Sequence, residues 1–290
     1  MITSGSNQHI QLLRTLHTPK GREQHGAFLM EGPHLLEAAF EAGITPLLIV
    51  YEPDALGKTA EGRRLIGRIE AAAATGAQVF EAAPAAIERA ADTRTPRGVV
   101  TSVASADVAA TKVRARRRGR MRPILLVLDA ISDPGNLGTI LRTALAADAD
   151  EVVLAPGCAD PLNPKVVRAG AGAHFRMPVQ ELASWQAARE VLHGAPAVRQ
   201  VLAAESSGRT AYTECDLTLR TALIIGNEAH GLSPEAQKLT TLPVSIPMYN
   251  RVESLNAAVA ASVILFEAAR QRRAAEREGR ETREQTTTED

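Results

Sequence analysis

The chain has 290 residues, enough for two domains; its 45% hydrophobic content supports well-filled cores, and 3% aromatic residues argue against aromatic stacking as the main binding mode. Basic and acidic side chains are equal in number, 33 of each, so the formal net charge is zero. We expect a cytoplasmic protein without membrane contact or bound metal, because no apolar run approaches the roughly 20 residues of a membrane helix, no signal-peptide pattern is present, and Cys158 and Cys215 form no metal-spaced pair.

Apolar periodicity in residues 1–104 predicts a small α/β domain. Helices are expected over residues 7–16, 33–42, 61–74 and 84–91, and strands over residues 47–51, 78–80 and 98–103. Residues 105–122 lose this pattern and are expected to form a linker.

The linker holds a strongly basic run, KVRARRRGRMR at residues 112–122, with seven bases and no acid. It supplies much of the positive excess in residues 1–122, where 17 Lys and Arg face 12 Asp and Glu. Such a run can release counterions from the phosphates of RNA or DNA, but a solvated linker between domains has the same composition. Composition alone leaves these two interpretations equal.

Residues 123–272 are predicted to form a second α/β domain, because near-continuous apolar strands, typical of buried parallel sheets, alternate with helices. Strands are expected over residues 123–129, 151–154, 200–204, 222–226 and 244–246, and helices over residues 137–147, 163–169, 183–192, 233–239 and 254–272. We therefore expect a mostly parallel sheet with helices on both faces. The tail, residues 273–290, is expected to be disordered.

Three segments place glycines and polar residues at the carboxyl ends of predicted strands, where open parallel sheets bind ligands. In the first, LDAISDPGNLGTILRTA, a strand runs into a turn, Asn136 can cap the next helix, and Arg142 follows six residues later. An ordinary strand–turn–helix with a surface arginine would have the same sequence.

The second segment, ALIIGNEAHGLS, ends an apolar strand at Gly226, where a missing side chain lets the backbone approach a ligand closely. Glu228 follows, either as a carboxylate that binds or catalyses or as a helix cap. The third segment, residues 244–270, opens an amphipathic helix with Ser254 and Asn256, which belong to a site or simply cap that helix.

Other site motifs are missing from the sequence. It contains no G-x-G-x-x-G after a strand and no G-x-x-x-x-G-K-[ST], so neither a Rossmann dinucleotide site nor a P-loop is supported. No Cys–His pair or G-x-S-x-G elbow indicates acyl transfer. The seven histidines are scattered along the chain and suggest no metal site.

Taken together, the three segments resemble the SpoU (TrmH-type) family of RNA ribose methyltransferases, within the SPOUT class. The resemblance is carried by N-x-G-x-x-x-R-x-A at residues 136–144, G-N-E-x-x-G-L at residues 226–232 and I-P-M…S-L-N at residues 246–256. Each motif alone is weak, but all of them in this order and spacing are highly specific. The stretches FLMEGPHLLEAA and TRTPRGVV in the N-terminal half look like the family's small RNA-binding domain, itself similar to a ribosomal protein.

This resemblance implies a deep trefoil knot in the second domain, a homodimer, and S-adenosylmethionine held in the knot. It implies catalytic and substrate positions at Asn136, Arg142, Glu228, Ser254 and Asn256, and cofactor contacts, largely from backbone, at Gly226, Ile246 and Leu255. The chain departs from the pattern at Ala229 and Asn250, positions that are often glycine in the family. Asn accepts the left-handed conformation at modest cost, so the second departure is benign.

The family's proposal makes the arginine of the first motif, here Arg142, the base that deprotonates the ribose hydroxyl. A guanidinium with a pKa above about 12 is rarely neutral at pH 7. Contact with an adjacent phosphate, which would align the hydroxyl and offset developing negative charge, is physically easier. Arg142 is required in either role.

We therefore expect S-adenosylmethionine-dependent methylation of a ribose 2′-hydroxyl in structured RNA. Ribosomal RNA is favoured because a separate RNA-binding domain suits a large folded target, and transfer RNA is the alternative. A non-catalytic RNA-binding assembly factor on the same scaffold is a competing hypothesis, and methylation of a base is a third. The basic run at residues 112–122 is then better interpreted as a hinge that contacts RNA.

Overall fold

The computed structural model describes residues 1–108, 124–194, 198–250 and 252–288. The basic run at residues 112–122 lies outside these residues. The chain forms two compact units. The N-terminal unit joins the residues up to Ala115 with Leu137–Arg142 and Asp160–Arg176, and the C-terminal unit contains the rest. None of the described helices is long and apolar enough to cross a membrane.

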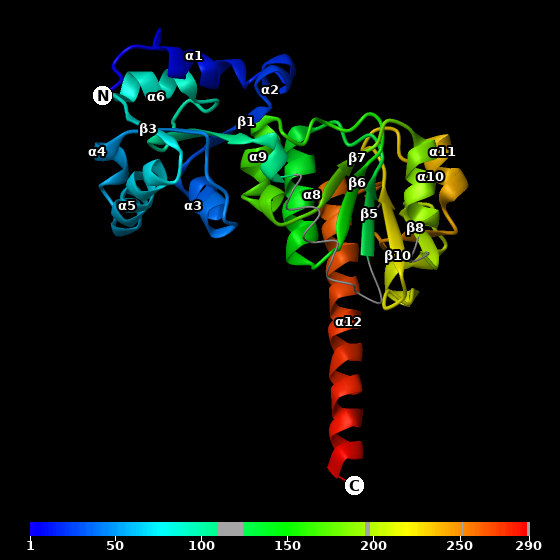
Figure 1. The fold of residues 1–290 in the computed structure, drawn as a ribbon. Coiled ribbons are helices and arrows are strands. Elements are labelled where there is room, and N and C mark those ends of the chain that lie inside the picture. The colour runs from blue at the N-terminus through cyan, green and yellow to red at the C-terminus, as the bar shows by residue number, and fades with distance from the viewer. Residues whose placement is uncertain (109–123, 195–197, 251, 289–290) are drawn as a thin grey trace. The chain divides into compact units, whose positions relative to one another are not determined.

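The N-terminal unit is built on a four-stranded sheet of order β1-β4-β2-β3 (Figure 1). Its strands are β1 (Ala27–Glu31), β2 (Leu48–Tyr51), β3 (Gln78–Glu81) and β4 (Val99–Ala104). The β1–β4 and β2–β4 pairs are antiparallel, and the β2–β3 pair is parallel. Its helices are α1 (Gln8–Thr15), α2 (Pro19–His25), α3 (Pro33–Glu41), α4 (Pro53–Leu56), α5 (Ala60–Ala74) and α6 (Pro84–Ala90). The sequence predicted four of these helices and missed the short α2 and α4.

Both faces of this sheet are buried, because alternate residues of each strand enter different hydrophobic clusters. Leu29 packs with residues of α1 and α6, whereas its neighbours Phe28 and Met30 pack with α3. The cluster around Phe28 also contains Val167 of α9 (Pro164–Gly170) and Phe175 of the short helix η1 (Ala173–Phe175). A segment that follows β6 in the chain therefore shares the core of the N-terminal unit, which a contiguous domain boundary does not anticipate.

The C-terminal unit contains a seven-stranded sheet of order β7-β6-β5-β10-β8-β11-β9, in which every pair is parallel. Its strands are β5 (Ile124–Leu128), β6 (Glu151–Leu154), β7 (Val179–Glu181), β8 (Gln200–Ala204), β9 (Thr210–Ala211), β10 (Thr221–Ile225) and β11 (Leu242–Ser245). From β5 the chain builds outward to β6 and β7, then crosses to the other side of the sheet. The predicted fold class is confirmed; the short β7 and β9 were not predicted.

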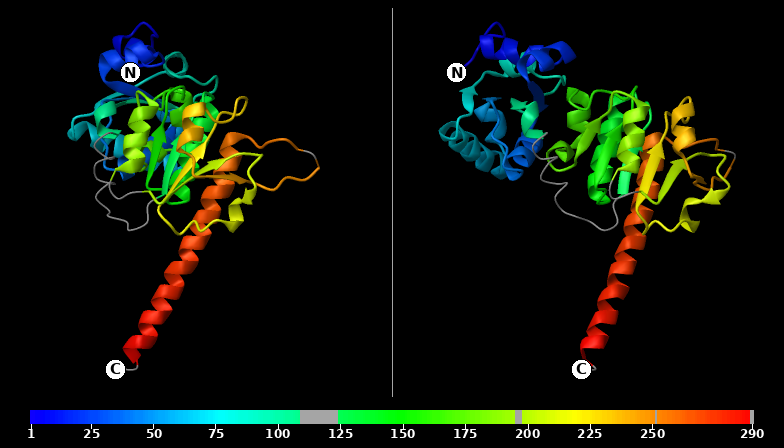
Figure 2. Two further views of the ribbon diagram at one scale, coloured as in Figure 1. Left: turned by 90° about the vertical axis from the view of Figure 1, so that its right-hand side faces the viewer. Right: turned by 45° about the vertical axis from the view of Figure 1, so that its right-hand side comes forward.

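Helices cover both faces of this sheet, as expected. Ala222 and Ile224 of β10 pack in a cluster with residues of α10 (Trp185–His193) and α11 (Pro234–Leu239). On the other face lies α12 (Ala257–Thr288), which continues past the sheet as one extended helix (Figures 1 and 2). Helix α8 (Pro134–Ala146) follows β5 and contributes residues to both units, and the 3-10 turn η2 (Tyr212–Glu214) precedes β10.

The last helix is longer than the sequence predicted. We expected a helix over residues 254–272 and disorder after it, but α12 runs to Thr288. Its first three predicted residues are not helical, because Asn256 caps it instead. Beyond residue 272 the chain reads RAAERE, and Ala, Arg and Glu all have high helix propensity, which extends a helix already nucleated on the sheet. The implied trefoil knot stays a prediction.

Gly172 provides a test of the packing between η1 and the N-terminal unit. Its φ is +87° and a Cβ there would lie 2.6 Å from the Cβ of Ala38. We expect Gly172→Ala to lower the free energy of unfolding by about 2–3 kcal/mol, because backbone strain adds to a clash in a closed core. Urea denaturation measures this.

The matched control is Gly43→Ala, which has a φ of +74° but open space around the added Cβ. It should lose only about 1 kcal/mol, the cost of the left-handed conformation. Equal losses in the two variants would contradict the proposed packing of Gly172 on Ala38.

Candidate active site

A pocket of about 260 Å³ lies in the C-terminal unit at the carboxyl ends of three neighbouring strands. The loops after β8, β10 and β11 and the start of α12 form it. The lining residues are Ala204, Glu205, Ser206, Ile225, Gly226, Asn227, Glu228, Gly231, Val244, Ile246, Met248, Glu253, Ser254, Leu255, Ala257 and Ala260. All three residues predicted to contact a cofactor, Gly226, Ile246 and Leu255, are among them. This is the edge at which parallel sheets bind ligands.

The loop after β10 is closed tightly on itself. The backbone N–H of Asn227 donates to the carbonyl of Gly231 at 3.0 Å, and the N–H of Gly231 donates back at 2.9 Å. A Cβ at Gly226 would lie 2.6 Å from the oxygen of Gly231, so no larger residue fits without displacing the loop. The sequence argument for glycine was ligand approach, and the structure adds that the turn itself requires glycine here.

The side chain of Asn227 fixes this loop to the end of β5. Its Nδ2 donates to the carbonyl of Ala130 at 2.8 Å. Its Oδ1 accepts the backbone N–H groups of Ala229 at 2.9 Å and His230 at 3.2 Å. One amide side chain therefore sets the shape of the loop that contains Ala229.

Asp129, the first residue after β5, anchors the far end of the same loop. It is 1% exposed, and its Oδ2 accepts the backbone N–H of Ser233 at 2.6 Å, at the start of α11. Its Oδ1 has no partner among the described residues. Sequence reasoning missed both Asp129 and Asn227, although each is a polar residue directly after an apolar strand, which was the available signal.

Three residues from the three motifs meet in one chain of hydrogen bonds. The side-chain Nδ2 of Asn136 donates to the Glu228 carboxylate. The Oδ1 of Asn136 accepts from Nδ2 of Asn256 at 3.0 Å. Asn256 also caps α12, since its Oδ1 accepts the N–H of Ala258 at 2.9 Å. The sequence offered two alternatives for Asn256, a helix cap or a site residue. The same side chain caps α12 and bonds to Asn136.

Asn136 is not the cap of α8, contrary to the sequence expectation. That cap is Asp133, whose side chain accepts the N–H of Asn136 at 2.8 Å, because Pro134 is suited to the first helical position. The side chain of Asn136 is thereby available for Glu228 and Asn256.

The two remaining predicted residues are placed differently. Ser254 is exposed and lines the pocket. Arg142 is exposed on α8, six residues beyond Asn136, in the segment that groups with the N-terminal unit.

Cys158 follows β6, but it is unsuited to nucleophilic chemistry. Burial raises the pKa of its thiol to about 11, and the negative charge of Asp129 adds to the effect. Its Sγ donates to the carbonyl of Leu128 at 3.3 Å. A thiol with this pKa is protonated at neutral pH. Within the described residues, no group of three or more His, Cys, Asp or Glu could hold a metal ion.

Comparison with known proteins decides the family. The family model described as "SpoU rRNA Methylase family" matches residues 123–266, and the model "MRM3-like substrate binding domain" matches residues 7–101. The chain is 33% identical to the 23S rRNA (guanosine(2553)-2′-O)-methyltransferase RlmP of Bacillus subtilis, over 91% of this chain and 97% of that protein. The chain belongs to the SpoU rRNA methylase family.

Solved structures of SpoU methyltransferases share its fold. AviRb from Streptomyces viridochromogenes, solved in complex with the cofactor AdoMet, has a TM-score of 0.75 and 29% identity, over 92% of this chain and 100% of that one. The AdoMet-bound rRNA methyltransferase from Sinorhizobium meliloti has a TM-score of 0.76 and 28% identity, over 93% and 97%. The family that the three motifs predicted is confirmed.

Asn227 is the residue on which we expect the shape of the pocket to depend. Asn227→Ala removes the bonds to Ala130, Ala229 and His230. We expect S-adenosylmethionine affinity, measured by calorimetry, to fall roughly tenfold or more, since the loop loses three hydrogen bonds worth about 1 kcal/mol each. Lys238→Ala, an exposed change on the adjacent helix α11, is the control. Unchanged affinity in the Asn227 variant would refute this role.

Proposed function

We propose that this protein transfers a methyl group from S-adenosylmethionine to the 2′-hydroxyl of a ribose in ribosomal RNA. The observation that carries the proposal is the hydrogen-bonded chain Asn256–Asn136–Glu228. Residues of the second and third motifs, which contain Glu228 and Asn256, also line the pocket. Family membership supports the reaction, and the name of the Bacillus subtilis relative supports both the 2′-hydroxyl and the ribosomal target.

The residues of the pocket fit this cofactor. Gly226 lines the pocket without a side chain, and Ile246 and Leu255 supply apolar surface. Glu205 and Glu253 contribute carboxylates, which suit hydroxyl and amino groups and a positive sulfonium. Bound S-adenosylmethionine would supply an already activated methyl group. Related structures with AdoMet bound support the same assignment.

Asn136 is suited to orient the ribose. An amide side chain has two N–H donors and two oxygen lone pairs, and the bonds to Glu228 and Asn256 use one of each. One donor and one lone pair are left for a sugar hydroxyl. The two partners hold the amide in one orientation, which reduces the cost of aligning the hydroxyl with the methyl group.

Arg142 is the proposed contact to the substrate phosphate. Its guanidinium is exposed and is therefore accessible to RNA. A group that stays positively charged can align a phosphodiester and offset charge that develops on the ribose oxygen, whereas a neutral guanidine is scarce at pH 7. We assign it this role rather than that of the base. Ser254, on the pocket rim, is proposed as a further contact to substrate.

Ribosomal RNA is preferred over transfer RNA because the N-terminal residues match a family model described as a substrate-binding domain. The assembly-factor alternative would be favoured by loss of Arg142 or Asn256, and both are present. If the substrate is ribosomal RNA in a bacterium, as for the Bacillus relative, the enzyme works in the cytoplasm.

We also propose a homodimer, with α12 at the interface. Val259 and Phe266 are 47% and 48% exposed and lie seven residues apart, hence on one face of the helix. Tyr249 and Val252, in the loop that leads to α12, are 82% and 51% exposed. A second copy of this apolar surface would cover it in a twofold contact, as isologous interfaces do.

The function is tested with labelled S-adenosylmethionine and ribosomal RNA that lacks the modification. Wild type should incorporate methyl groups into ribose, detected as nuclease-resistant linkages. Arg142→Ala should lower the rate at least a hundredfold, about 2.7 kcal/mol or more of transition-state stabilisation, while calorimetry shows cofactor affinity within twofold of wild type.

Two results would contradict this. The proposed activity would be contradicted if the wild type methylated no ribose in any ribosomal or transfer RNA. Loss of cofactor binding by a folded Arg142→Ala would show that the arginine serves the pocket rather than the substrate.

The dimer is tested by Val259→Glu combined with Phe266→Glu. Charges on both exposed positions should shift the protein from dimer to monomer in light scattering without lowering helix content, since neither side chain is in the core. Glu changes at exposed Arg270 and Arg273, on the same helix, serve as the control. A wild-type monomer at micromolar concentration would refute the proposal.

A further inference from the structure

The loop between α6 and β4 carries two exposed arginines whose charges are not used within the protein. Arg94 and Arg97 lie in the sequence ADTRTPRG. Both side chains are exposed, and neither forms an ion pair or hydrogen bond among the described residues. Exposed arginines commonly project from mobile loops as solvated charges. The loop here is instead fixed by two carboxylates of its own unit.

Glu31, the last residue of β1, fixes the start of this loop. One carboxylate oxygen accepts the backbone N–H groups of Asp92 at 2.9 Å and Thr93 at 3.1 Å. The other accepts the hydroxyl of Thr93. Hydrogen bonds to a carboxylate are stronger than those between neutral groups, so the start of the loop has a defined conformation.

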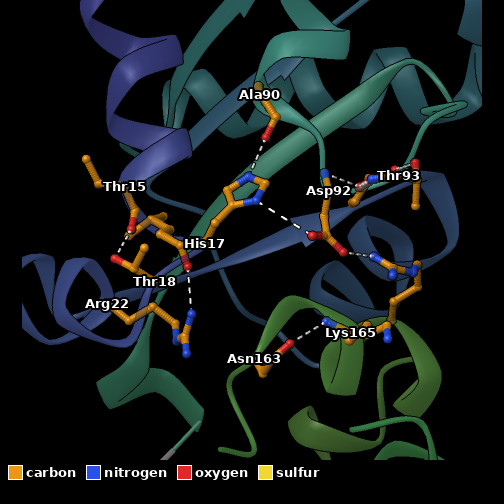
Figure 3. A network of polar contacts seen from close by, with 12 residues as sticks. Thr15, His17, Thr18, Arg22, Ala90, Asp92, Thr93, Asn163 and Lys165 are labelled. Atoms are coloured by element: carbon orange, nitrogen blue, oxygen red, sulfur yellow. Dashed lines mark hydrogen bonds and ion pairs between the residues drawn. The ribbon is translucent and has the colours of Figure 1, made fainter.

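Asp92 then joins this loop to α9 (Figure 3). Its Oδ2 accepts from Nη1 of Arg168 at 2.9 Å, and its Oδ1 lies 3.7 Å from Nδ1 of His17. His17 is itself held by the carbonyl of Ala90 at 2.9 Å through Nε2. Because Arg168 is on α9, the side of that helix with Lys165 lies beside the arginine loop, within the same N-terminal unit.

A second contact joins α2 to the segment that precedes α9. The guanidinium of Arg22 is 4% exposed and donates from Nε to the carboxylate of Asp160 at 3.2 Å, and from Nη1 to the carbonyl of Leu16 at 2.9 Å. Its Nη2 donates to Asp160 as well. Arg22 therefore joins α2 and the end of α1 to the segment that contains α9.

The two acids that hold this loop are committed to structure, whereas three bases of the same unit have no side-chain partner among the described residues. Glu31 and Asp92 are occupied by the loop, by Arg168 and by His17. Lys165 is exposed and its side chain has no ion pair among the described residues, as for Arg94 and Arg97. Three unpaired cations on a preorganised surface favour a polyanion with fixed charge spacing.

We propose that Arg94, Arg97 and Lys165 form one phosphate-binding surface that holds the RNA substrate, with Glu31 as the positioning residue of its loop. The proposal rests on the proposed function for the identity of the RNA. It deepens that function by naming where the substrate backbone is bound. The ligand chemistry is the phosphodiester backbone rather than stacked bases, because Arg and Lys are the usual phosphate contacts and the three residues include no aromatic ring. It adds to any contribution of residues 112–122.

The test compares RNA binding by Arg94→Ala/Arg97→Ala/Lys165→Ala with that of wild type. The probe is an unmodified 23S ribosomal RNA transcript, titrated at 50 to 300 mM salt without cofactor. We expect affinity to fall at least tenfold, and the slope of log affinity against log salt to decrease by about 2, since each lost phosphate contact removes about 0.7 to 0.9. Affinity for S-adenosylmethionine should stay within twofold of wild type.

The control is Arg14→Ala/Lys58→Ala/Arg64→Ala, which removes the same charges from exposed positions of the same unit. It should change RNA affinity less than twofold. Equal weakening by both triple variants would mean that net charge alone matters, and would overturn the surface. The proposal would also be overturned if the Arg94/Arg97/Lys165 variant bound RNA with the affinity and salt slope of the wild type.

Glu31→Gln tests the positioning role. The amide keeps the volume but loses one accepting oxygen and the charge, so the loop loosens. We expect KM for RNA to rise severalfold with kcat at saturating RNA nearly unchanged, a split that general destabilisation would not give. Unchanged KM would remove Glu31 from the proposal.

The two hypotheses fail separately. Wild type that binds the transcript but transfers no methyl group refutes the proposed function, while the RNA titrations still decide the surface. If the wild type methylates RNA and the Arg94/Arg97/Lys165 variant binds RNA as tightly as the wild type does, only the proposed phosphate-binding surface is refuted.

Discussion

The amide of Asn136 is the interaction on which the geometry of the site depends. It accepts from Asn256 at the start of α12 and donates to Glu228 in the loop after β10. These elements are 92 and 120 residues away in sequence, and each is positioned by its own strand or helix. Because an amide has one donor end and one acceptor end, it can join a carboxylate to a second amide only in this orientation. The charge of Glu228 thereby fixes which face of Asn136 is left for a sugar.

Asp129 and Asn227 hold in place the loop that carries Glu228. Asp129 holds the N–H of Ser233, and Asn227 holds the carbonyl of Ala130, so the loop that carries Glu228 is fixed at both ends to the terminus of β5. Gly226 lets the backbone cross close to Gly231. The loop that lines the pocket after β10 is therefore shaped by hydrogen bonds to the residues that follow β5.

Local patterns predicted most strands and helices because apolar runs, prolines and caps act within a few residues. The β5 and β10 strands were found this way, and so was Gly226 at the end of β10, whereas Ile246 and Leu255 of the pocket came from the resemblance to the family. What could not be predicted depends on contacts between distant segments. The grouping of residues 160–176 with the N-terminal unit rests on Arg22 with Asp160 and Asp92 with Arg168, pairs 138 and 76 residues apart. Asp129 and Asn227 each follow an apolar strand, but their contacts to Ser233 and Ala130 join separate loops and could not be predicted from that position alone.

Helix α8 explains why one short motif contains an asparagine, a glycine and an arginine. Asn136 enters the hydrogen-bonded triad at the first turn. Two residues later, a Cβ on Gly138 would lie 2.5 Å from Cβ of Ala169 and 2.6 Å from the carbonyl of Val166, so glycine is what allows α9 to pack this closely. Arg142 follows on the same rigid helix, about 9 Å further along its axis than Asn136. The glycine thus fixes the middle of α8 against α9, the helix that carries Lys165 and Arg168. Because both residues are on one α-helix, the phosphate contact proposed for Arg142 and the ribose contact proposed for Asn136 would keep a constant separation, which alignment of one nucleotide requires.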